Sequence, residues 1–248
     1  MIARTSLGLP ESIRACLFDL DGVLTRTATV HMAAWKRTFD GFLQAHEPGE
    51  PEFSQLDYNR FVDGKPRADG VRDFLASRGI ILPEGSPGDP ADAATVQGIA
   101  SRKNELVLAE LAEHGVDVYP GSVDYLRAVK AAGLATAVVT ASANGEQVIA
   151  AAGFPDLIDV RIDGVVAARD GLRGKPQPDT FLAGARALGF SPAEAVVFED
   201  ALSGVAAGRA GEFGFVVGVD RVGQAEGLAE HGADVVVQDL SELLDGKA

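Results

Sequence analysis

The sequence predicts an α/β protein: a doubly wound parallel sheet with an inserted all-helical domain. Short apolar runs rich in β-branched residues alternate with helix-length segments that end at glycine, as in parallel sheets covered on both faces. The first apolar run is separated from the others by a long region with helical periodicity and no convincing strand alternation. We therefore expect a core domain formed by residues 1–26 and 116–248, and a helical domain formed by residues 27–115.

Composition narrows the class of protein. Hydrophobic residues make up 46% and charged residues 23% of the 248, which fits an ordinary globular protein. The formal net charge of −14 argues against nucleic acid as a partner, because phosphate backbones favour basic surfaces. The single Cys16 excludes an internal disulfide and is expected in the core. Because no apolar run approaches membrane-spanning length and the N-terminus lacks a signal-peptide pattern, we expect no membrane partner and a cytoplasmic location.

The first strand is expected at Ile13–Phe18, and two carboxylates follow it directly. On a flat strand Asp19 and Asp21 would share one face, where like charges repel unless a cation, a bend or a proton intervenes. Gly22 allows the backbone to turn sharply just after them. The pattern fits either a polar turn or a metal-assisted nucleophile at the carboxyl end of the strand. An EF-hand loop is excluded, since Gly22 comes too early.

The helical domain begins with apolar residues at steps of three and four from about Thr27 to Ala45. His31 and Trp35 lie four residues apart and hence on one face of this helix. The segment Pro48–Pro51 ends it. Further helices are expected between residues 58 and 113, interrupted by a loop rich in Gly, Pro and Asp at Pro83–Pro90.

The rest of the core is predicted as strands alternating with helices after a linker at residues 116–121. The expected strands are 135–140, 195–198, 213–219 and 235–237. The expected helices are 123–132, 145–152, 178–188 and 203–210, most of them followed by glycine. A short helical turn with a capping box is expected at 191–194.

Polar side chains follow several of these strands, and ligands of open parallel sheets bind beyond the carboxyl ends of the strands. Four carboxylates, two hydroxyls and one lysine are therefore expected to converge at this edge. They are Asp19, Asp21, Thr140, Ser142, Lys175, Glu199 and Asp200.

This set of groups is suited to phosphoryl transfer. Carboxylate oxygens are ligands that Mg²⁺ prefers, and hydroxyls before a helix can bind an anion. Lys175 would neutralise the transferring phosphoryl group. A P-loop is excluded, because Pro176 follows Lys175 and Arg169 stands where its first glycine should be. Covalent transfer fits best, with Asp19 attacking phosphorus and Asp21 acting as general acid and base. Taken one at a time, these residues have simpler interpretations: Thr140 could cap a helix, and Lys175 could be an ordinary surface lysine.

The motifs in their order resemble the haloacid-dehalogenase-type phosphotransferase superfamily, and the helical insert resembles its mobile cap. The residues that carry the resemblance are Asp19-x-Asp21-Gly22-Val23-x-Thr25, Thr140, Lys175-Pro176 and Glu199-Asp200. Within it, the chain is most similar to the β-phosphoglucomutase family, on His31, Trp35, Arg67, Lys103, Ser142 and Asn144.

The resemblance implies a role for each of these residues. Asp19 would be the phosphorylated nucleophile, and Mg²⁺ would take side chains of Asp19, Glu199 and Asp200 together with the backbone carbonyl of Asp21. Catalysis would also use Thr140 and Lys175. The substrate, a sugar phosphate, would be bound by His31, Trp35, Arg67, Lys103, Ala141, Ser142 and Asn144. Glucose 1,6-bisphosphate would act as activator, and we expect a monomer.

Two departures from the family pattern and four alternatives accompany this interpretation. Arg26 stands where the family commonly has an acidic residue, and Ala143 where the mutase has a lysine near the phosphate. A sugar-phosphate phosphatase would use the same Asp19 with water as acceptor, and a non-catalytic binding module would keep only the fold. His31 is alternatively a polar residue beside Trp35, and Lys103 a solvated helix lysine.

Overall fold

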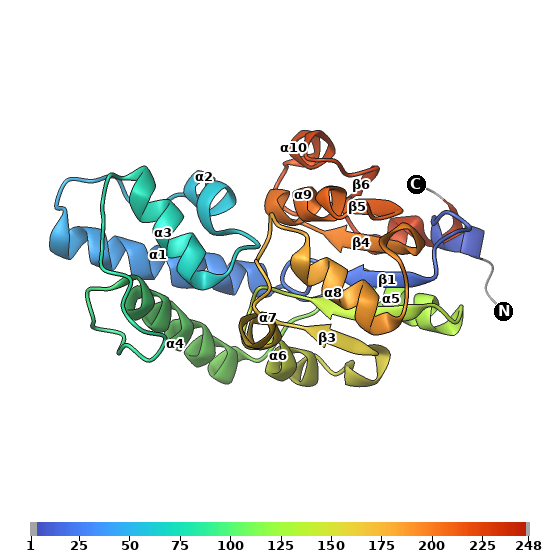
Figure 1. Ribbon diagram of the computed structural model, residues 1–248, viewed down its shortest axis with the longest axis horizontal. Coiled ribbons are helices and arrows are strands. Elements are labelled where there is room, and N and C mark those ends of the chain that lie inside the picture. Colours follow the sequence, from blue (N-terminus) through green and yellow to red (C-terminus); the bar gives the residue numbers. More distant parts are fainter. Residues whose placement is uncertain (1–3, 247–248) are drawn as a thin grey trace. The chain divides into compact units, whose positions relative to one another are not determined.

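The structure, a computed structural model, describes residues 4–246. The chain divides into two compact units. The core unit combines the residues up to Arg26 with those from Val116 onward, and the helical unit is Thr27–Gly115. Along the chain, the helical unit comes after the first strand and before the rest of the core unit, as the colours in Figure 1 show.

The core unit is built on a parallel sheet that has six strands in the described part of the chain, in the order β3-β2-β1-β4-β5-β6. β1 lies in the middle, where Phe18 is paired with Val138 of β2 and with Phe198 of β4. The strand that leads to Asp19 is therefore flanked by the strands that lead to Thr140 and Glu199. The strands are β1 Ala15–Phe18, β2 Ala135–Val139, β3 Val160–Ile162, β4 Ala195–Glu199, β5 Phe215–Val219 and β6 Val235–Val237.

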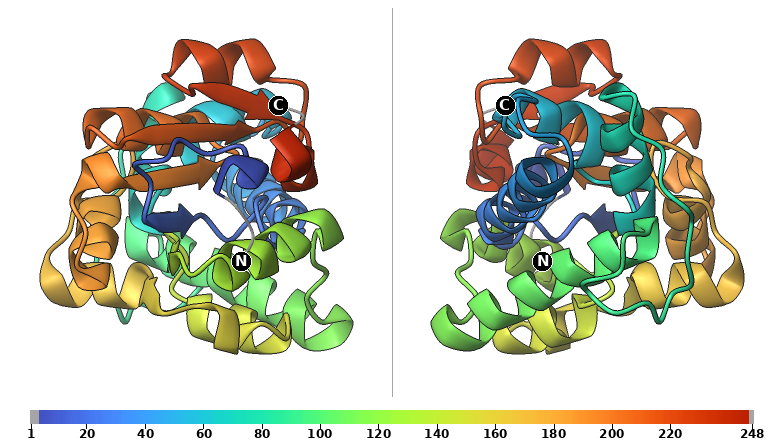
Figure 2. Two further views of the ribbon diagram at one scale, coloured as in Figure 1. Left: turned by 90° about the vertical axis from the view of Figure 1, so that its right-hand side faces the viewer. Right: turned by 90° about the vertical axis from the view of Figure 1, so that its left-hand side faces the viewer.

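Helices cover both faces of the sheet, as the views in Figure 2 show. On one face, Phe181 of α8 (Asp179–Leu188) and Val205 of α9 (Leu202–Ala210) pack in a buried cluster with strand residues such as Leu17. On the other face, the ring of Tyr125 from α5 (Pro120–Ala131) lies 5.5 Å from that of Phe198. These strand side chains point to opposite faces because directions alternate along a strand. The predicted doubly wound parallel sheet is confirmed.

Shorter elements complete the core unit. Ser191 and Glu194 form the predicted capping box at the turn before β4. Cys16 is buried in β1, as predicted. The remaining elements are η1 Arg4–Leu7, α6 Gly145–Ala151, η3 Pro155–Leu157, α7 Gly164–Asp170, η4 Pro192–Glu194, α10 Ala225–Glu230 and η5 Leu240–Gly246.

The helical unit has its own aromatic core. Trp35 and Phe39 of the first helix stack at 4.9 Å, and Phe39 packs on Phe74 at 4.2 Å between ring centres. Burial of such large rings supplies most of the driving force for packing these helices together. The elements are α1 Thr27–His46, α2 Gln55–Asp57, the π-helical η2 Tyr58–Val62, α3 Arg67–Ser77 and α4 Val96–His114. Within the described residues, no helix is long and apolar enough to cross a membrane.

Candidate active site

The carboxylates of the first motif lie in a tight turn directly after β1. Asp19 is 5% exposed, and its backbone N–H donates to the carbonyl of Phe198 on β4 at 2.9 Å. Gly22 has φ +96°, a conformation that glycine adopts without strain. Its N–H donates to the carbonyl of Thr25 at 2.8 Å, which closes the turn. The turn therefore ends the strand and carries the chain away just after Asp21.

Lys175 lies at the centre of the buried charges. Its Nζ donates to Asp19 Oδ1 at 2.5 Å and to Glu199 Oε1, and also to the carbonyl of Val139 at 3.2 Å. The ammonium lies 4.8 Å from the ring centre of Phe181. Lys175 is 3% exposed, so these partners replace most of its water. The sequence alternative of an ordinary surface lysine is therefore wrong.

Burial and neighbouring charges have opposite effects on the pKa values of Lys175 and Asp19. Burial disfavours the ammonium of Lys175, but the carboxylates of Asp19 and Glu199 outweigh it and raise the pKa of Lys175 above its ordinary value. Burial raises the pKa of Asp19 well above its ordinary range, and Lys175 only partly opposes this effect. Lys175 is thus held charged, and Asp19 lies where a further cation would favour its ionised form.

The carboxylates at this edge form a set that fits a divalent cation. Asp19, Glu199 and Asp200 each offer an oxygen, all within 4.8 Å of one another, and all three residues are buried. The ammonium of Lys175 is bonded to two of them, Asp19 and Glu199. Only glycine leaves room for Asp200, because a Cβ at position 22 would lie 1.8 Å from its Oδ2. Carboxylate oxygens are the donors that Mg²⁺ prefers.

The loop after β2 brings hydroxyls to the same edge. Thr140 Oγ1 donates to Asp21 Oδ2 at 3.2 Å and accepts the backbone N–H of Ser142 at 3.1 Å. Ser142 Oγ in turn accepts the N–H of Asn144 at 3.2 Å, just before α6. The loop, which includes Ala141, is thus ordered by its own hydroxyls and tied to Asp21.

A family model described as haloacid dehalogenase-like hydrolase matches residues 13–212, which include the whole of this constellation. The chain belongs to the haloacid dehalogenase-like hydrolase family.

Three similar members of this family bear on its activity. The chain is 54% identical over 246 residues to a β-phosphoglucomutase of Mycobacterium bovis, covering 96% of this chain and 94% of the relative. It is 30% identical to the validoxylamine A 7'-phosphate phosphatase of Streptomyces hygroscopicus, covering 93% of this chain and 95% of the relative. The crystal structure of β-phosphoglucomutase from Clostridium difficile superposes with a TM-score of 0.72 at 27% identity, covering 93% of each chain.

In this family member, the helical unit brings together three of the residues singled out from its sequence. Lys103 Nζ of α4 lies 3.0 Å from His31 Nδ1 of α1 and 5.1 Å from the ring centre of Trp35. Lys103 is 3% exposed, so it is not the solvated helix lysine of the alternative interpretation. Arg67 is the first residue of α3, and burial lowers its pKa.

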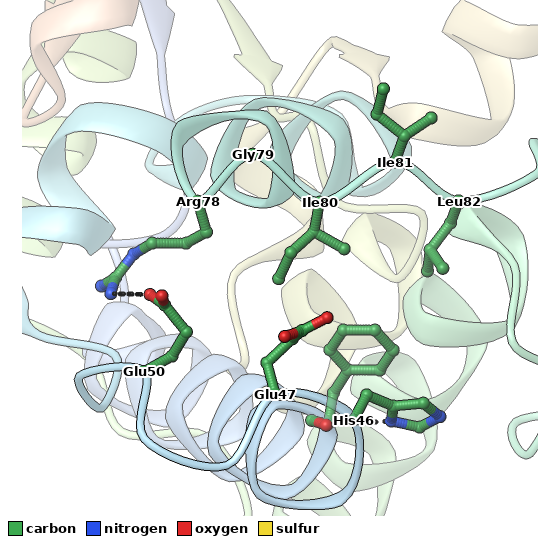
Figure 3. A pocket seen from close by; sticks show the side chains of 9 residues that line it. His46, Glu47, Glu50, Arg78, Gly79, Ile80, Ile81 and Leu82 are labelled. Carbon is green, nitrogen blue, oxygen red and sulfur yellow. Dashed lines mark hydrogen bonds and ion pairs between the residues drawn. The ribbon is translucent and has the colours of Figure 1, made fainter.

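The helical unit also contains a hollow of about 430 Å³ beside the end of α1 and the segment that follows α3 (Figure 3). Its arginine, Arg78, forms ion pairs with Glu50 at 3.3 Å and with Asp57 at 3.1 Å. Glu47 adds a further carboxylate to the lining. An already paired arginine beside acidic groups is poorly suited to a phosphate, so this hollow is not the candidate site of a phosphoryl-transfer enzyme.

Two residues near the motif were not singled out from the sequence. Arg221 Nε donates to the carbonyl of Gly22 at 2.8 Å, and Gln224 Nε2 donates to the carbonyl of Asp200 at 2.9 Å. Both residues follow β5. Ligands of parallel sheets bind beyond the carboxyl ends of the strands, and this strand-end rule pointed to Asp19 and Glu199. It points to the loop after β5 as well, so the sequence did contain a signal for Asp220–Gln224.

Proposed function

We propose that this family member acts as a β-phosphoglucomutase, converting β-glucose 1-phosphate to glucose 6-phosphate through a phosphorylated Asp19. The observation that carries this choice of substrate is the 54% identity, over nearly both whole chains, to the enzyme of M. bovis. The buried Asp19, Lys175 and Glu199 support the phosphoryl-transfer chemistry, which the family shares more widely.

In the first transfer, an oxygen of Asp19 forms a bond to phosphorus of glucose 1,6-bisphosphate while the bond from phosphorus to the sugar oxygen breaks. Asp21 gives that sugar oxygen its proton. The carboxylate of Asp21 is within hydrogen-bond reach of Thr140, which holds it beside Asp19. Lys175, bonded to Asp19, offsets the negative charge that gathers during the transfer.

In the second transfer, the 6-hydroxyl of β-glucose 1-phosphate attacks the phosphorus on Asp19. Asp21 takes the proton of this hydroxyl, and the Asp19 carboxylate is released. The product is again the 1,6-bisphosphate, which yields glucose 6-phosphate when its 1-phosphoryl group is returned to Asp19. The same two carboxylates therefore serve both halves of the cycle with their roles reversed.

Mg²⁺ would be held by Asp19, Glu199 and Asp200 together with the backbone carbonyl of Asp21. The three buried carboxylates, whose oxygens lie within 4.8 Å of one another, support this assignment. When bound, the ion draws charge from the transferring phosphoryl oxygens. Ser142 and Asn144, with the backbone of Ala141, would bind the phosphoryl group beside Asp19, and the order of their loop supports this role.

Residues of the helical unit would supply the selectivity for a sugar that carries phosphate. Arg67 would bind the distal phosphate, and the lowered pKa of this partly buried guanidinium reflects a charge with little water around it. His31, Trp35 and Lys103 form one cluster that would contact the sugar phosphate. A mutase must keep water from the phosphorylated Asp19, so these residues would also favour closure over the sugar.

A sugar-phosphate phosphatase is the second candidate, because a phosphatase is among the similar family members. The two are separated by supplying β-glucose 1-phosphate, Mg²⁺ and catalytic glucose 1,6-bisphosphate, then following glucose 6-phosphate and free phosphate together. We expect glucose 6-phosphate at a rate far above that of phosphate release. Free phosphate without glucose 6-phosphate would contradict the mutase proposal, and neither product from any sugar phosphate would favour a binding module.

Our proposal also covers the substrate, the oligomeric state and the cellular location of the protein. The substrate is a small sugar phosphate. Because the net charge is −14, the protein surface as a whole would repel this anion, and a few cationic side chains at the site would have to bind it. We expect a monomer that works in the cytoplasm without nucleic acid or a membrane as partner. Light scattering and cell fractionation would test these two expectations.

A further inference from the structure

We propose that Arg221 is a positioning residue that holds the turn carrying Asp21 in the arrangement that phosphoryl transfer needs. The proposal rests on the roles assigned above to Asp19 and Asp21. Arg221 Nε donates to the carbonyl of Gly22 at 2.8 Å, and its Nη2 donates to the carbonyl of Val23 at 3.3 Å. These carbonyls belong to the two residues that directly follow Asp21.

The turn closes without using these two carbonyls. The N–H of Gly22 donates to Thr25, while the N–H and hydroxyl of Thr25 both donate to the carbonyl of Leu20, at 2.9 and 3.0 Å. The carbonyls of Gly22 and Val23 instead accept from the planar guanidinium fork of Arg221. A fork that binds two neighbouring carbonyls restricts the orientation of both peptide groups, which a single donor does not do.

The guanidinium is itself fixed from several sides. Its Nη1 donates to the carbonyl of Gln238 at 2.5 Å, and its Nη2 also donates to Ser122 Oγ at 3.2 Å. The carboxylate of Asp239 lies 3.6 Å away, and the Arg221 side chain is 12% exposed. Arg221 therefore links the turn to α5 and to the segment that follows β6.

An aromatic ring connects the same guanidinium to the segments through which the chain leaves and re-enters the core unit. Arg221 lies 3.5 Å from the ring centre of Tyr119, and Arg26 lies 4.5 Å from the same centre. Tyr119 N–H donates to the carbonyl of Leu24 at 3.0 Å, and Thr25 forms a β-bridge with Val118. Arg26 stands where the family commonly has an acidic residue. In this structure its guanidinium packs on the ring of Tyr119, which also contacts Arg221.

The expected effect follows from the geometry of the turn. Loss of the fork would let the peptides after Asp21 rotate while Thr140 still binds its carboxylate from the other side. A displacement of about 1 Å at a reacting group can cost on the order of 10²-fold in rate. We therefore expect the turnover number to fall more than substrate binding does.

Arg209 provides a matched control. Its Nε and Nη2 donate to the carbonyl of Gly232 at 3.1 and 2.7 Å, and Nη2 pairs with Asp234 at 2.7 Å. It thus makes the same kinds of bond as Arg221, to a loop that contains none of the motif residues. Arg209→Met measures what such a loss costs in stability alone.

The experiment compares Arg221→Met, Arg221→Lys and Arg209→Met with the natural protein, using thermal unfolding and hydrolysis of p-nitrophenyl phosphate. In this hydrolysis Asp21 would take the proton of the water that releases phosphate from Asp19. We expect Arg221→Met to lower kcat by about 10- to 100-fold with KM changed less than about threefold. Arg221→Lys should recover part of kcat, since one ammonium can reach one carbonyl. Arg209→Met should lose less thermal stability, because the Arg209 side chain is 51% exposed, and should keep kcat within about twofold.

Amide exchange in the peptide 13–26 gives a readout that needs no activity. We expect the amides of the turn to exchange at least about tenfold faster in Arg221→Met than in Arg209→Met. Equal exchange in the two variants, or a kcat of Arg221→Met that matches Arg209→Met, would overturn the proposal. Glucose 6-phosphate is not measured here, so failure of the mutase activity leaves this test intact.

Discussion

Lys175 Nζ donates to the carboxylate of Asp19 at 2.5 Å, and both side chains are buried. The two residues are 156 positions apart, and the bond joins the end of β1 to the loop before α8. Because Glu199 accepts from the same ammonium, one cation connects two carboxylates of the proposed metal site. The ammonium thus offsets part of the negative charge of these carboxylates and takes part in the proposed chemistry.

Replacing Lys175 should expose this double role. Lys175→Met removes the cation and leaves Asp19 and Glu199 buried without it, so we expect a loss of about 3–5 kcal/mol in unfolding free energy in EDTA. Added Mg²⁺ should restore part of the loss but not the turnover. The exposed pair between Lys130 and Asp159 is the control, since Lys130→Met should cost less than about 1 kcal/mol. Denaturant unfolding with EDTA or Mg²⁺ measures both, and an equal loss in the two variants would contradict the account.

Gly22 tests the space left for Asp200. In Gly22→Ala the new Cβ would meet the Asp200 carboxylate, so we expect Mg²⁺ affinity to fall at least about tenfold. Gly133→Ala is the matched control, because Gly133 also has positive φ, +77°, and no atom lies within 4 Å of its added Cβ. Both variants should lose about 1–2 kcal/mol of stability from backbone strain. Calorimetric titration with Mg²⁺ decides, and unchanged affinity in Gly22→Ala would argue that Asp200 is no ligand.

Asp21 can be tested through the leaving group of the substrate. Asp21→Asn removes the proposed acid and base, so kcat with a sugar phosphate should fall about 10²- to 10⁴-fold. Phosphorylation of Asp19 by p-nitrophenyl phosphate should fall much less, because p-nitrophenolate leaves without a proton. Rapid-quench measurement of phosphorylated protein compares the two donors. An equal fall with both would show that Asp21 does not act as the acid.

The pH dependence of stability should include a contribution from Asp159. Burial acts to raise the pKa of Asp159, but Lys130 and the backbone and hydroxyl of Thr136 outweigh it and hold the pKa below its ordinary value. A carboxyl with a lowered pKa in the folded state stabilises above its unfolded pKa, about 4, and loses that effect as pH falls further. Asp159→Asn should therefore cost up to about 1 kcal/mol at pH 7 and progressively less below pH 4. Urea unfolding of both proteins across this pH range tests the prediction. A difference in unfolding free energy that stays constant with pH would contradict it.

The sequence was sufficient for the main architecture because most strands of the core are continuous apolar runs. The strand-end rule then placed Asp19, Thr140 and Glu199 at one edge, and the structure does bring these residues together there. β3 was missed because Arg161 in its middle interrupts the apolar run, whereas β6, which is equally short and also at an edge, consists of three valines and was predicted. No continuous apolar run therefore marks β3. α7 and α10 were missed as well, and both are short.

The other gaps concern contacts between distant parts of the chain. Helical periodicity placed His31 and Trp35 on one face, but it could not say that Lys103 would meet both of them. Arg221 was missed although it follows the end of β5, where the sequence rule on strand ends points, because that rule does not say which residues of a loop reach the motif. Its partners near the motif are backbone carbonyls, and a bond to backbone leaves no mark on the residue types of the turn.

The central claim is that Asp19 carries a phosphoryl group and passes it to a sugar. It is tested most directly by labelling the protein with ³²P from glucose 1,6-bisphosphate, locating the label by peptide mass spectrometry, and chasing with excess β-glucose 1-phosphate. The account predicts label on Asp19, its absence in Asp19→Ala, and its transfer to sugar bisphosphate on the chase. Label on another residue, or its release as inorganic phosphate while β-glucose 1-phosphate is present, would contradict the account.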